Sequence, residues 1–287
     1  MMWRLKIGLK ILLSRMPWGY AVWQRLGLFR HGRMDQSAYA MEVLNHHLEQ
    51  AGLAGDLAGK TVLELGPGDS IATAVAVHSM GGRAILVDAG PFASGDTGVY
   101  RDLERSLRAA GRTPADLSGC RSLPEVLAAC GADYRTEGLN SLKSLASESV
   151  EFIFSQAVLE HVRRGECLET LREMRRVLKP GGIGSHRIDL RDHLGGALNH
   201  LRFRREWWES DFMATSGFYT NRLGFGEWLE LFAEAGFAAE VTAVRRWPRL
   251  PTPRRKLAAE FRERPDEELR VSGLDVLLRR ERKEDPA

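Results

Sequence analysis

The spacing of hydrophobic positions divides the chain near residue 58. Before that point, Ala40, Leu44, His47 and Ala51 fall at helical intervals, which predicts a helix. After it, short apolar runs that are typical of buried strands alternate with helical patterns. The predicted strands are 61–65, 83–88, 133–137, 149–155, 183–190, 239–246 and 271–278. The predicted helices are 1–16, 36–51, one capped by Asp69 or Ser70 that runs to residue 80, 100–110, 123–130, 166–178 and 226–235.

Strands that alternate with helices predict an α/β fold in which a largely parallel, doubly wound sheet is covered on both faces. Ligands of such sheets bind beyond the carboxyl ends of the strands. An insertion at 191–225 follows the fifth predicted strand and is rich in arginine and aromatic residues. This composition suits a polar acceptor with ring faces, such as a sugar, and it equally suits a lid packed on the sheet.

Charge is unevenly distributed. The 287 residues have an ordinary globular composition, 44% hydrophobic and 28% charged, and a net charge of only +3. Residues 1–33 nevertheless hold seven Lys and Arg and no Asp or Glu, so the rest of the chain is net −4. An acidic body argues against a nucleic-acid partner. Three cysteines, none at metal-ligand spacing, indicate a reducing compartment, and we therefore expect a cytoplasmic protein.

The basic arm, residues 1–33, also carries several aromatic residues: Trp3, Trp18, Tyr20, Trp23 and Phe29. Its longest apolar stretch, residues 7–13, is too short to span a bilayer. Two interpretations remain open. The arm is either a peripheral contact with an anionic membrane or a helical cap that matches the acidic body electrostatically.

The segment 62–70 runs from a hydrophobic strand into a turn of small residues and a helix start. Gly66 and Gly68 allow the backbone to approach a ligand closely. A dinucleotide site requires a third glycine where Ile71 stands, and Glu64 would repel a pyrophosphate. No Gly-Lys-Ser or Gly-Lys-Thr follows the turn, as a phosphate loop would require. A ligand that carries an ammonium group would instead be stabilised by Glu64.

Asp88 ends the second predicted strand, 20 residues after Gly68, where a carboxylate can accept hydrogen bonds from both hydroxyls of a ribose. At this spacing the chain resembles the class I S-adenosylmethionine-dependent methyltransferases, of the type 11-like domain. Segment 64–68 looks like their first motif and Asp88 like their second, and 150–162 and 173–182 are similar to later family segments. The resemblance covers about residues 58–190. Ser70 and Glu151 depart mildly from the family pattern.

The resemblance implies a Rossmann-like sheet of seven strands, one of them antiparallel, and S-adenosyl-L-methionine as the cofactor. It implies that the methionine end contacts Glu64 and the turn Gly66, Pro67 and Gly68, and that Asp88 binds the ribose. The adenine would lie near Glu137, Gly138 and Gln156. We expect an N-terminal arm at 1–57, a methyltransferase domain at 58–280 with the insertion 191–225, and a charged tail at 281–287.

Candidate catalytic residues follow the fourth and fifth predicted strands. Glu160 and His161 resemble part of a Glu-x-x-Glu-His motif that is associated with a divalent metal in some methyltransferases, but Ala157 occupies its first position. We therefore expect no metal. His161 or His193 is the predicted general base, with Asp189 or Asp192 as its orienting carboxylate.

His186 is a further catalytic candidate, although on a strand it points away from the face that Asp189 occupies. The alternative is that the cluster at 186–193 forms a buried hydrogen-bond network that fixes the insertion. The sequence thus favours an enzyme that O-methylates a small molecule or a glycan. The competing hypotheses are an RNA-modifying methyltransferase and a non-catalytic binding or scaffold protein that keeps the fold.

Overall fold

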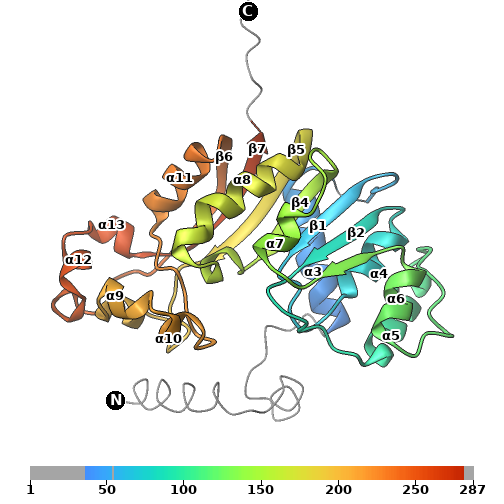
Figure 1. Ribbon diagram of the computed structural model, residues 1–287, viewed down its shortest axis with the longest axis horizontal. Coiled ribbons are helices and arrows are strands. Elements are labelled where there is room, and N and C mark those ends of the chain that lie inside the picture. Colours follow the sequence, from blue (N-terminus) through green and yellow to red (C-terminus); the bar gives the residue numbers. More distant parts are fainter. Residues whose placement is uncertain (1–35, 54, 281–287) are drawn as a thin grey trace, which may run out of the picture.

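The computed structural model describes residues 36–53 and 55–280. Its centre is a sheet of seven strands in the order β3-β2-β1-β4-β5-β7-β6 (Figure 1). The strands are β1 (Thr61–Leu65), β2 (Arg83–Val87), β3 (Asp133–Arg135), β4 (Val150–Gln156), β5 (Leu178–Asp189), β6 (Phe237–Arg246) and β7 (Val271–Arg280). Strands β1 to β5 pair in parallel, and β7 is antiparallel to both of its neighbours. The predicted fold class is confirmed.

Most predicted strands match the observed ones within two residues, and β5 is the exception. It begins at Leu178, five residues before the predicted start, because Leu178 already pairs with Val150 of β4 and the turn-forming segment 179–182, with Gly181 at a φ of +80°, is a bulge within the strand. A register irregularity between Val150 and Phe152 absorbs the extra residues. The preceding helix still ends at Val177, so the helix boundary was predicted correctly while the structure that follows it was not.

The helices are α3 (Ser37–Gln50), α4 (Ala72–Ser79), α5 (Thr97–Ala109), α6 (Leu123–Ala129), α7 (Leu139–Lys143), α8 (Cys167–Val177), α9 (Arg205–Trp208), α10 (Asp211–Ala214), α11 (Phe225–Glu234), α12 (Ala259–Arg262) and α13 (Asp266–Leu269). The sequence missed α7, α9, α10, α12 and α13, which are all too short to show a helical period. Ile71 is the N-cap of α4, and Ser70 Oγ accepts from the backbone N–H of Ala72.

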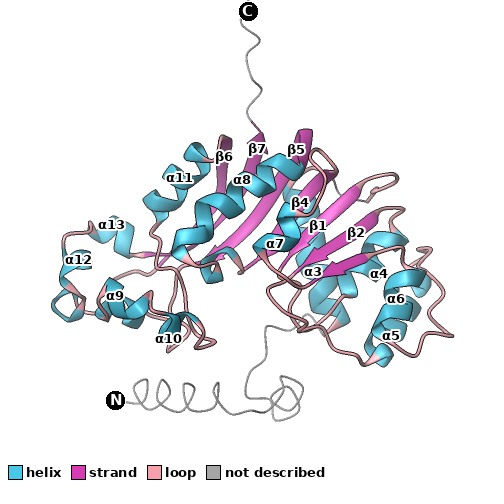
Figure 2. Ribbon diagram, in the orientation of Figure 1, coloured by secondary structure: helices cyan, strands magenta, loops and turns pink. Residues whose placement is uncertain are grey.

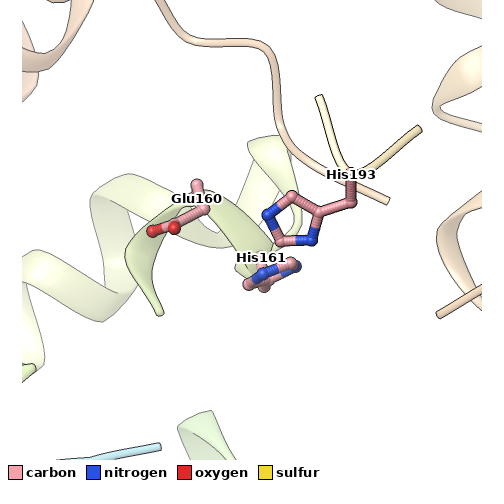
Figure 3. Close-up of side chains that lie close together, drawn as sticks. All are labelled: Glu160, His161 and His193. Atoms are coloured by element: carbon pink, nitrogen blue, oxygen red, sulfur yellow. The ribbon is translucent and has the colours of Figure 1, made fainter. Parts of the chain in front are cut away.

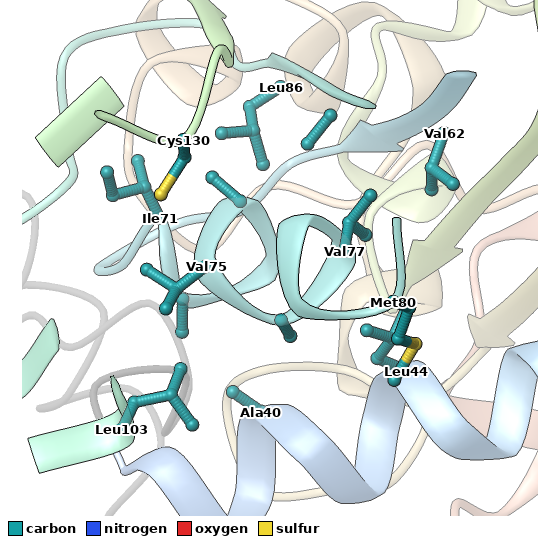
Figure 4. Close-up of a cluster of buried hydrophobic side chains, with 14 of the residues drawn as sticks. Ala40, Leu44, Val62, Ile71, Val75, Val77, Met80, Leu86, Leu103 and Cys130 are labelled. Atoms are coloured by element: carbon teal, nitrogen blue, oxygen red, sulfur yellow. The ribbon is translucent and has the colours of Figure 1, made fainter. Parts of the chain in front are cut away.

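Helices cover both faces of the sheet (Figure 2). Helices α3, α4, α5 and α6 pack on one face, against Val62 of β1 and Phe154 of β4 (Figure 4). Helices α7, α8 and α11 pack on the other, against Leu63 and Ile153. Neighbouring residues of one strand thus enter opposite cores, as the two-residue period of a strand requires. This packing holds the carboxyl ends of β1 to β5 at one edge.

The insertion 191–225 forms a module with a segment that the sequence left unassigned, residues 247–270. Two small cores lie in this region, one around Trp208 and one around Phe261. The guanidinium of Arg222 lies 5.5 Å from the Trp208 ring and 5.1 Å from the Phe261 ring, so it joins the two cores. The insertion therefore folds against the chain between β6 and β7 rather than on its own.

Three predictions fall on residues outside the described ranges: the helix 1–16, the basic arm and the tail 281–287. The membrane contact of the arm and the cytoplasmic location stay predictions. Among the described residues, no helix combines the length and the apolar character that crossing a membrane requires.

An ion cluster joins the three strands at the end of the sheet. Asp275 of β7 accepts from Arg187 of β5 at 2.8 and 2.9 Å and from Arg245 of β6 at 2.7 Å. His46 of α3 lies 3.5 Å from the same carboxylate. Burial alone would raise the pKa of Asp275, but the hydrogen bonds from the two arginines lower it to about 2.

We expect Asp275→Asn to lower the free energy of unfolding by about 3 kcal/mol, because it leaves two half-buried guanidinium groups without their counter-charge. Urea unfolding at pH 7 measures the loss. Glu240→Gln is the matched control, since it breaks an exposed pair with Arg279 and should cost less than about 0.5 kcal/mol. Equal losses for the two variants would show that the cluster does not hold the strands together.

Candidate functional site

The glycine turn after β1 has a backbone that a ligand can approach closely. Gly66 and Gly68 have φ angles of +68° and +64°, a region that side chains rarely adopt. The N–H of Gly66 donates to the carbonyl of Val87 at the end of β2. A Cβ atom at Gly66 would lie 2.5 Å from Cγ2 of Val158, in the loop after β4. The turn is thus wedged between the ends of two neighbouring strands, with the buried Pro67 at its centre.

Asp88 follows β2 and connects the segments that follow β1 and β3. Its Oδ2 accepts from the N–H of Gly68 at 2.9 Å, and its Oδ1 accepts from Ala89 at 2.7 Å. Its backbone carbonyl accepts from the N–H of Gly138 at 2.8 Å. Glu137 therefore lies one residue from this contact, with its own N–H donating to Ser141 Oγ. The structure brings the segments around residues 66, 88 and 138 together, as the sequence predicts.

Glu64 is buried in β1, between Leu86 of β2 and Phe154 of β4. The pKa of its carboxyl is raised from 4.5 to about 8, chiefly by burial; the nearby Thr73 hydroxyl lowers it, and the charge of Asp88 acts in the same direction as burial. Among the described residues, its Oε2 has no hydrogen-bond partner. A buried carboxyl in this state is costly and would be stabilised by a cationic ligand.

Gln156 ends β4 and is held by a residue that the sequence did not single out for function. Its side-chain Oε1 only accepts, so Nε2 of His47 in α3 carries the proton and donates to it at 3.1 Å. Nδ1 of His47 then accepts from Ser185 Oγ at 2.8 Å. Burial, followed by the nearby His46, lowers the pKa of His47 to about 3, so the ring is neutral. A histidine in the otherwise apolar stripe of the predicted helix was the available signal.

A second cluster of polar side chains, Glu160, His161 and His193, comes from the segments that follow β4 and β5 (Figure 3). Glu160 and His161 belong to the short helix η1 (Leu159–His161), and His193 lies in the loop after β5. One donor atom from each of the three side chains lies within 4.8 Å of the others. The two imidazole rings are 4.7 Å apart and nearly edge to face. Three such donors can hold a metal ion.

Glu160 resembles Glu64 in its environment. It is buried, its Oε1 accepts from the N–H of Asp189 at 3.2 Å, and its Oε2 has no hydrogen-bond partner within the described part of the chain. Burial raises the pKa of its carboxyl well above 4.5, and the charge of Asp189 acts in the same direction.

Three predicted residues occupy places that differ from their predicted roles. His186 is buried in the sheet and bonded to Ser155, and burial lowers its pKa to about 3, so we no longer assign it to catalysis. Both oxygens of Asp189 accept from Arg191. Asp192 accepts from four backbone N–H groups of its own loop, Leu194, Gly195, Ala197 and Asn199.

For Asp192 this is the predicted network that fixes the insertion, and it replaces the predicted orienting role. Asp189, the other carboxylate predicted to orient a histidine, forms an ion pair with the Arg191 guanidinium. The orienting role of Asp189 stays a prediction, because this carboxylate also interacts electrostatically with His193.

Comparison with known proteins gives one family match. The model of the methyltransferase domain family matches residues 102–185, a segment that contains Glu137, Gln156 and His161 but begins after Asp88. No curated protein matches the chain.

Solved structures of similar shape include several methyltransferases. The YcgJ protein of Bacillus subtilis is 16% identical, covering 82% of this chain and 99% of that chain, with a TM-score of 0.45. An S-adenosylmethionine-dependent methyltransferase of Methanosarcina mazei is 19% identical, covering 81% and 96%, with a TM-score of 0.42. A Haemonchus contortus phosphoethanolamine N-methyltransferase, solved with S-adenosylhomocysteine, is 16% identical, covering 69% and 39%, with a TM-score of 0.40. Likeness at this level says nothing about the substrate.

The strand order, the single antiparallel strand and the site at the carboxyl edge agree with the domain match. Residues 102–185, less than a third of the chain, are therefore similar to the methyltransferase domain family.

Proposed function

We propose that the protein transfers a methyl group from S-adenosylmethionine to a hydroxyl group of a small molecule or glycan. The observation that carries the donor side is Glu64, a buried carboxyl with an unpartnered oxygen beside a glycine turn. The donor carries an ammonium group on its methionine end, and a cation at this position offsets the cost of the buried carboxylate.

The remaining donor contacts follow from the same strand ends. In this proposal Gly66, Pro67 and Gly68 line the methionine end, and Asp88 accepts from the ribose hydroxyls. Glu137 and Gln156 flank the adenine, and His47 keeps the Gln156 side chain in one orientation. Because every one of these positions is set by backbone or buried contacts, binding requires little rearrangement of the protein.

S-adenosylmethionine, when bound, supplies a methyl group on a positively charged sulfur. The protein aligns the acceptor oxygen with that methyl group and excludes water. An alkyl hydroxyl is a weak nucleophile and needs help in losing its proton. His161 and His193 lie together beyond β4 and β5, where we place the acceptor hydroxyl.

The insertion supplies side chains that suit a ring-faced polar acceptor. Trp207 and Phe212 are 41% and 45% exposed, which is unusual for large hydrophobic residues in this structure. Arg191 follows β5, and half of its side-chain surface is exposed. Exposed aromatic rings and guanidinium groups are both used in the recognition of sugars and aromatic ligands.

The direct test uses the purified chain with S-adenosylmethionine labelled in its methyl group. We expect label to enter a hydroxyl-bearing small molecule or glycan from a panel of acceptors, in a product that resists the mild base that cleaves methyl esters. Transfer to RNA, or to nitrogen only, would contradict the proposed acceptor class.

We expect Glu64→Gln to weaken binding of S-adenosylhomocysteine by about 100-fold, because the amide cannot balance the ligand's ammonium charge. Asp88→Asn should weaken it by about tenfold or more through the ribose. Isothermal titration calorimetry measures both. Asp56→Asn is the control, since Asp56 is exposed and caps a turn far from the site. Wild-type affinity in both test variants would refute the donor site.

The pKa of Glu64 also predicts a pH dependence of ligand-free stability. A carboxyl whose pKa is about 8 in the folded chain and 4.5 otherwise adds stability that is fully present below pH 4.5 and is lost as pH rises through 8. The free energy of unfolding of the wild type should therefore fall between pH 5 and pH 9 relative to Glu64→Gln. Urea unfolding across this range measures the difference. Parallel curves would show that Glu64 titrates normally.

A further inference from the structure

The strongest unassigned feature is the trio of Glu160, His161 and His193. The sequence predicts no metal because Ala157 removes one carboxylate from a local motif. That reasoning used neighbours in the sequence alone. The structure brings a third donor, His193, from the loop after β5 to the Glu160 and His161 pair, with donor atoms within 4.8 Å of one another (Figure 3).

A backbone bond fixes His161 in the tautomer that a metal ligand requires. Nδ1 of His161 donates to the carbonyl of Tyr219 at 2.8 Å, so the lone pair of this ring lies on Nε2. A metal-bound histidine usually makes this kind of bond through its other nitrogen. His193 follows Asp192, whose carboxylate binds the backbone of residues 194–199 and so holds the loop in place.

Glu160 supplies the negative charge. Its carboxyl is buried, and the oxygen that Asp189 does not engage has no hydrogen-bond partner among the described residues. Leaving this oxygen unpaired is expensive, whereas a cation bound by it and the two imidazoles would offset the cost. A mechanism in which a histidine acts as the general base gives no role to this Glu160 oxygen. The carboxylates of Asp189 and Asp192 accept hydrogen bonds from Arg191 and from the loop backbone, respectively.

We propose that Glu160, His161 and His193 bind a divalent cation at the acceptor side of the site. Two imidazoles and one carboxylate favour Zn²⁺, Co²⁺, Mn²⁺ or Fe²⁺ over Mg²⁺ and Ca²⁺, which prefer all-oxygen sites. The two imidazole rings are exposed, and a ligand atom of each already lies within 4.8 Å of the Glu160 carboxylate and of the other ring. Three protein ligands leave coordination positions for an oxygen of the acceptor.

This inference rests on the proposed function only in naming that oxygen acceptor. A cation there lowers the pKa of a hydroxyl and so serves an alcohol, which needs activation, more than an amine or a thiol. The two histidines would then act on the acceptor through the ion rather than as bases.

The test titrates Co²⁺ alone into the metal-free full chain and follows the visible absorption bands of the bound ion. We expect one Co²⁺ per chain, displaced by an equal concentration of Zn²⁺ but not of Mg²⁺. His193→Gln and Glu160→Gln should each weaken Co²⁺ binding by about tenfold or more. His193 is exposed, so this variant should keep the wild-type melting temperature even if the buried Glu160→Gln variant does not.

His78→Gln is the matched control, because this histidine lies in α4 and bonds the carbonyl of Cys130, away from the cluster. It should bind Co²⁺ as the wild type does. Failure of the wild type to bind Co²⁺, or unchanged affinity in folded His193→Gln, would overturn the proposal. Binding of S-adenosylhomocysteine by His193→Gln, expected at wild-type affinity, keeps failure of the metal site distinct from failure of the donor site.

Discussion

The buried carboxyl of Glu64 is the constraint on which the site depends. It lies in the central strand of a parallel sheet, flanked by Leu86 and Phe154, where no solvent can stabilise its charge. The fold keeps it there because β1 pairs on both sides, and the adjacent glycine turn and Asp88 are placed by the same pairing. In the proposed complex, the positive charge of the ligand would stabilise the Glu64 carboxylate, and its ribose would donate hydrogen bonds to Asp88.

The acceptor side repeats this arrangement. Glu160 is also buried with an unpartnered oxygen, directly after the strand next to β1. The two carboxyls thus lie on neighbouring segments of the carboxyl edge, one facing the proposed methyl donor and one facing the proposed cation. Binding of a positively charged partner would offset the cost of burying each carboxyl, which is why both groups are proposed as binding residues.

The sequence predicted the sheet because its strands are short apolar runs bounded by turn residues, and β1 matches residue for residue. It predicted the donor side for a related reason. Glu64, the glycine turn and Asp88 are each tied to a strand end, and parallel strands bring those ends together. The five short helices, α7, α9, α10, α12 and α13, have no detectable period, and the Pro-Gly segment 179–182 predicts the end of a helix where the structure has a bulge within β5.

The contacts that the sequence could not supply are those between distant segments. His47 and Gln156 meet across 109 positions, and the joining of residues 191–225 with 247–270 depends on Arg222 packing between two aromatic rings. Glu160, His161 and His193 were predicted as separate residues, because the loop fold that turns Asp192 inward and leaves His193 beside His161 is a tertiary feature.

The most direct measurement is a crystal structure of the chain with S-adenosylhomocysteine. The account predicts the ligand's ammonium group within hydrogen-bond distance of the Glu64 carboxylate and its ribose hydroxyls on Asp88, with the sulfur directed toward the side of the site that holds His161. A ligand bound elsewhere, or one whose ammonium group does not contact Glu64, would contradict it.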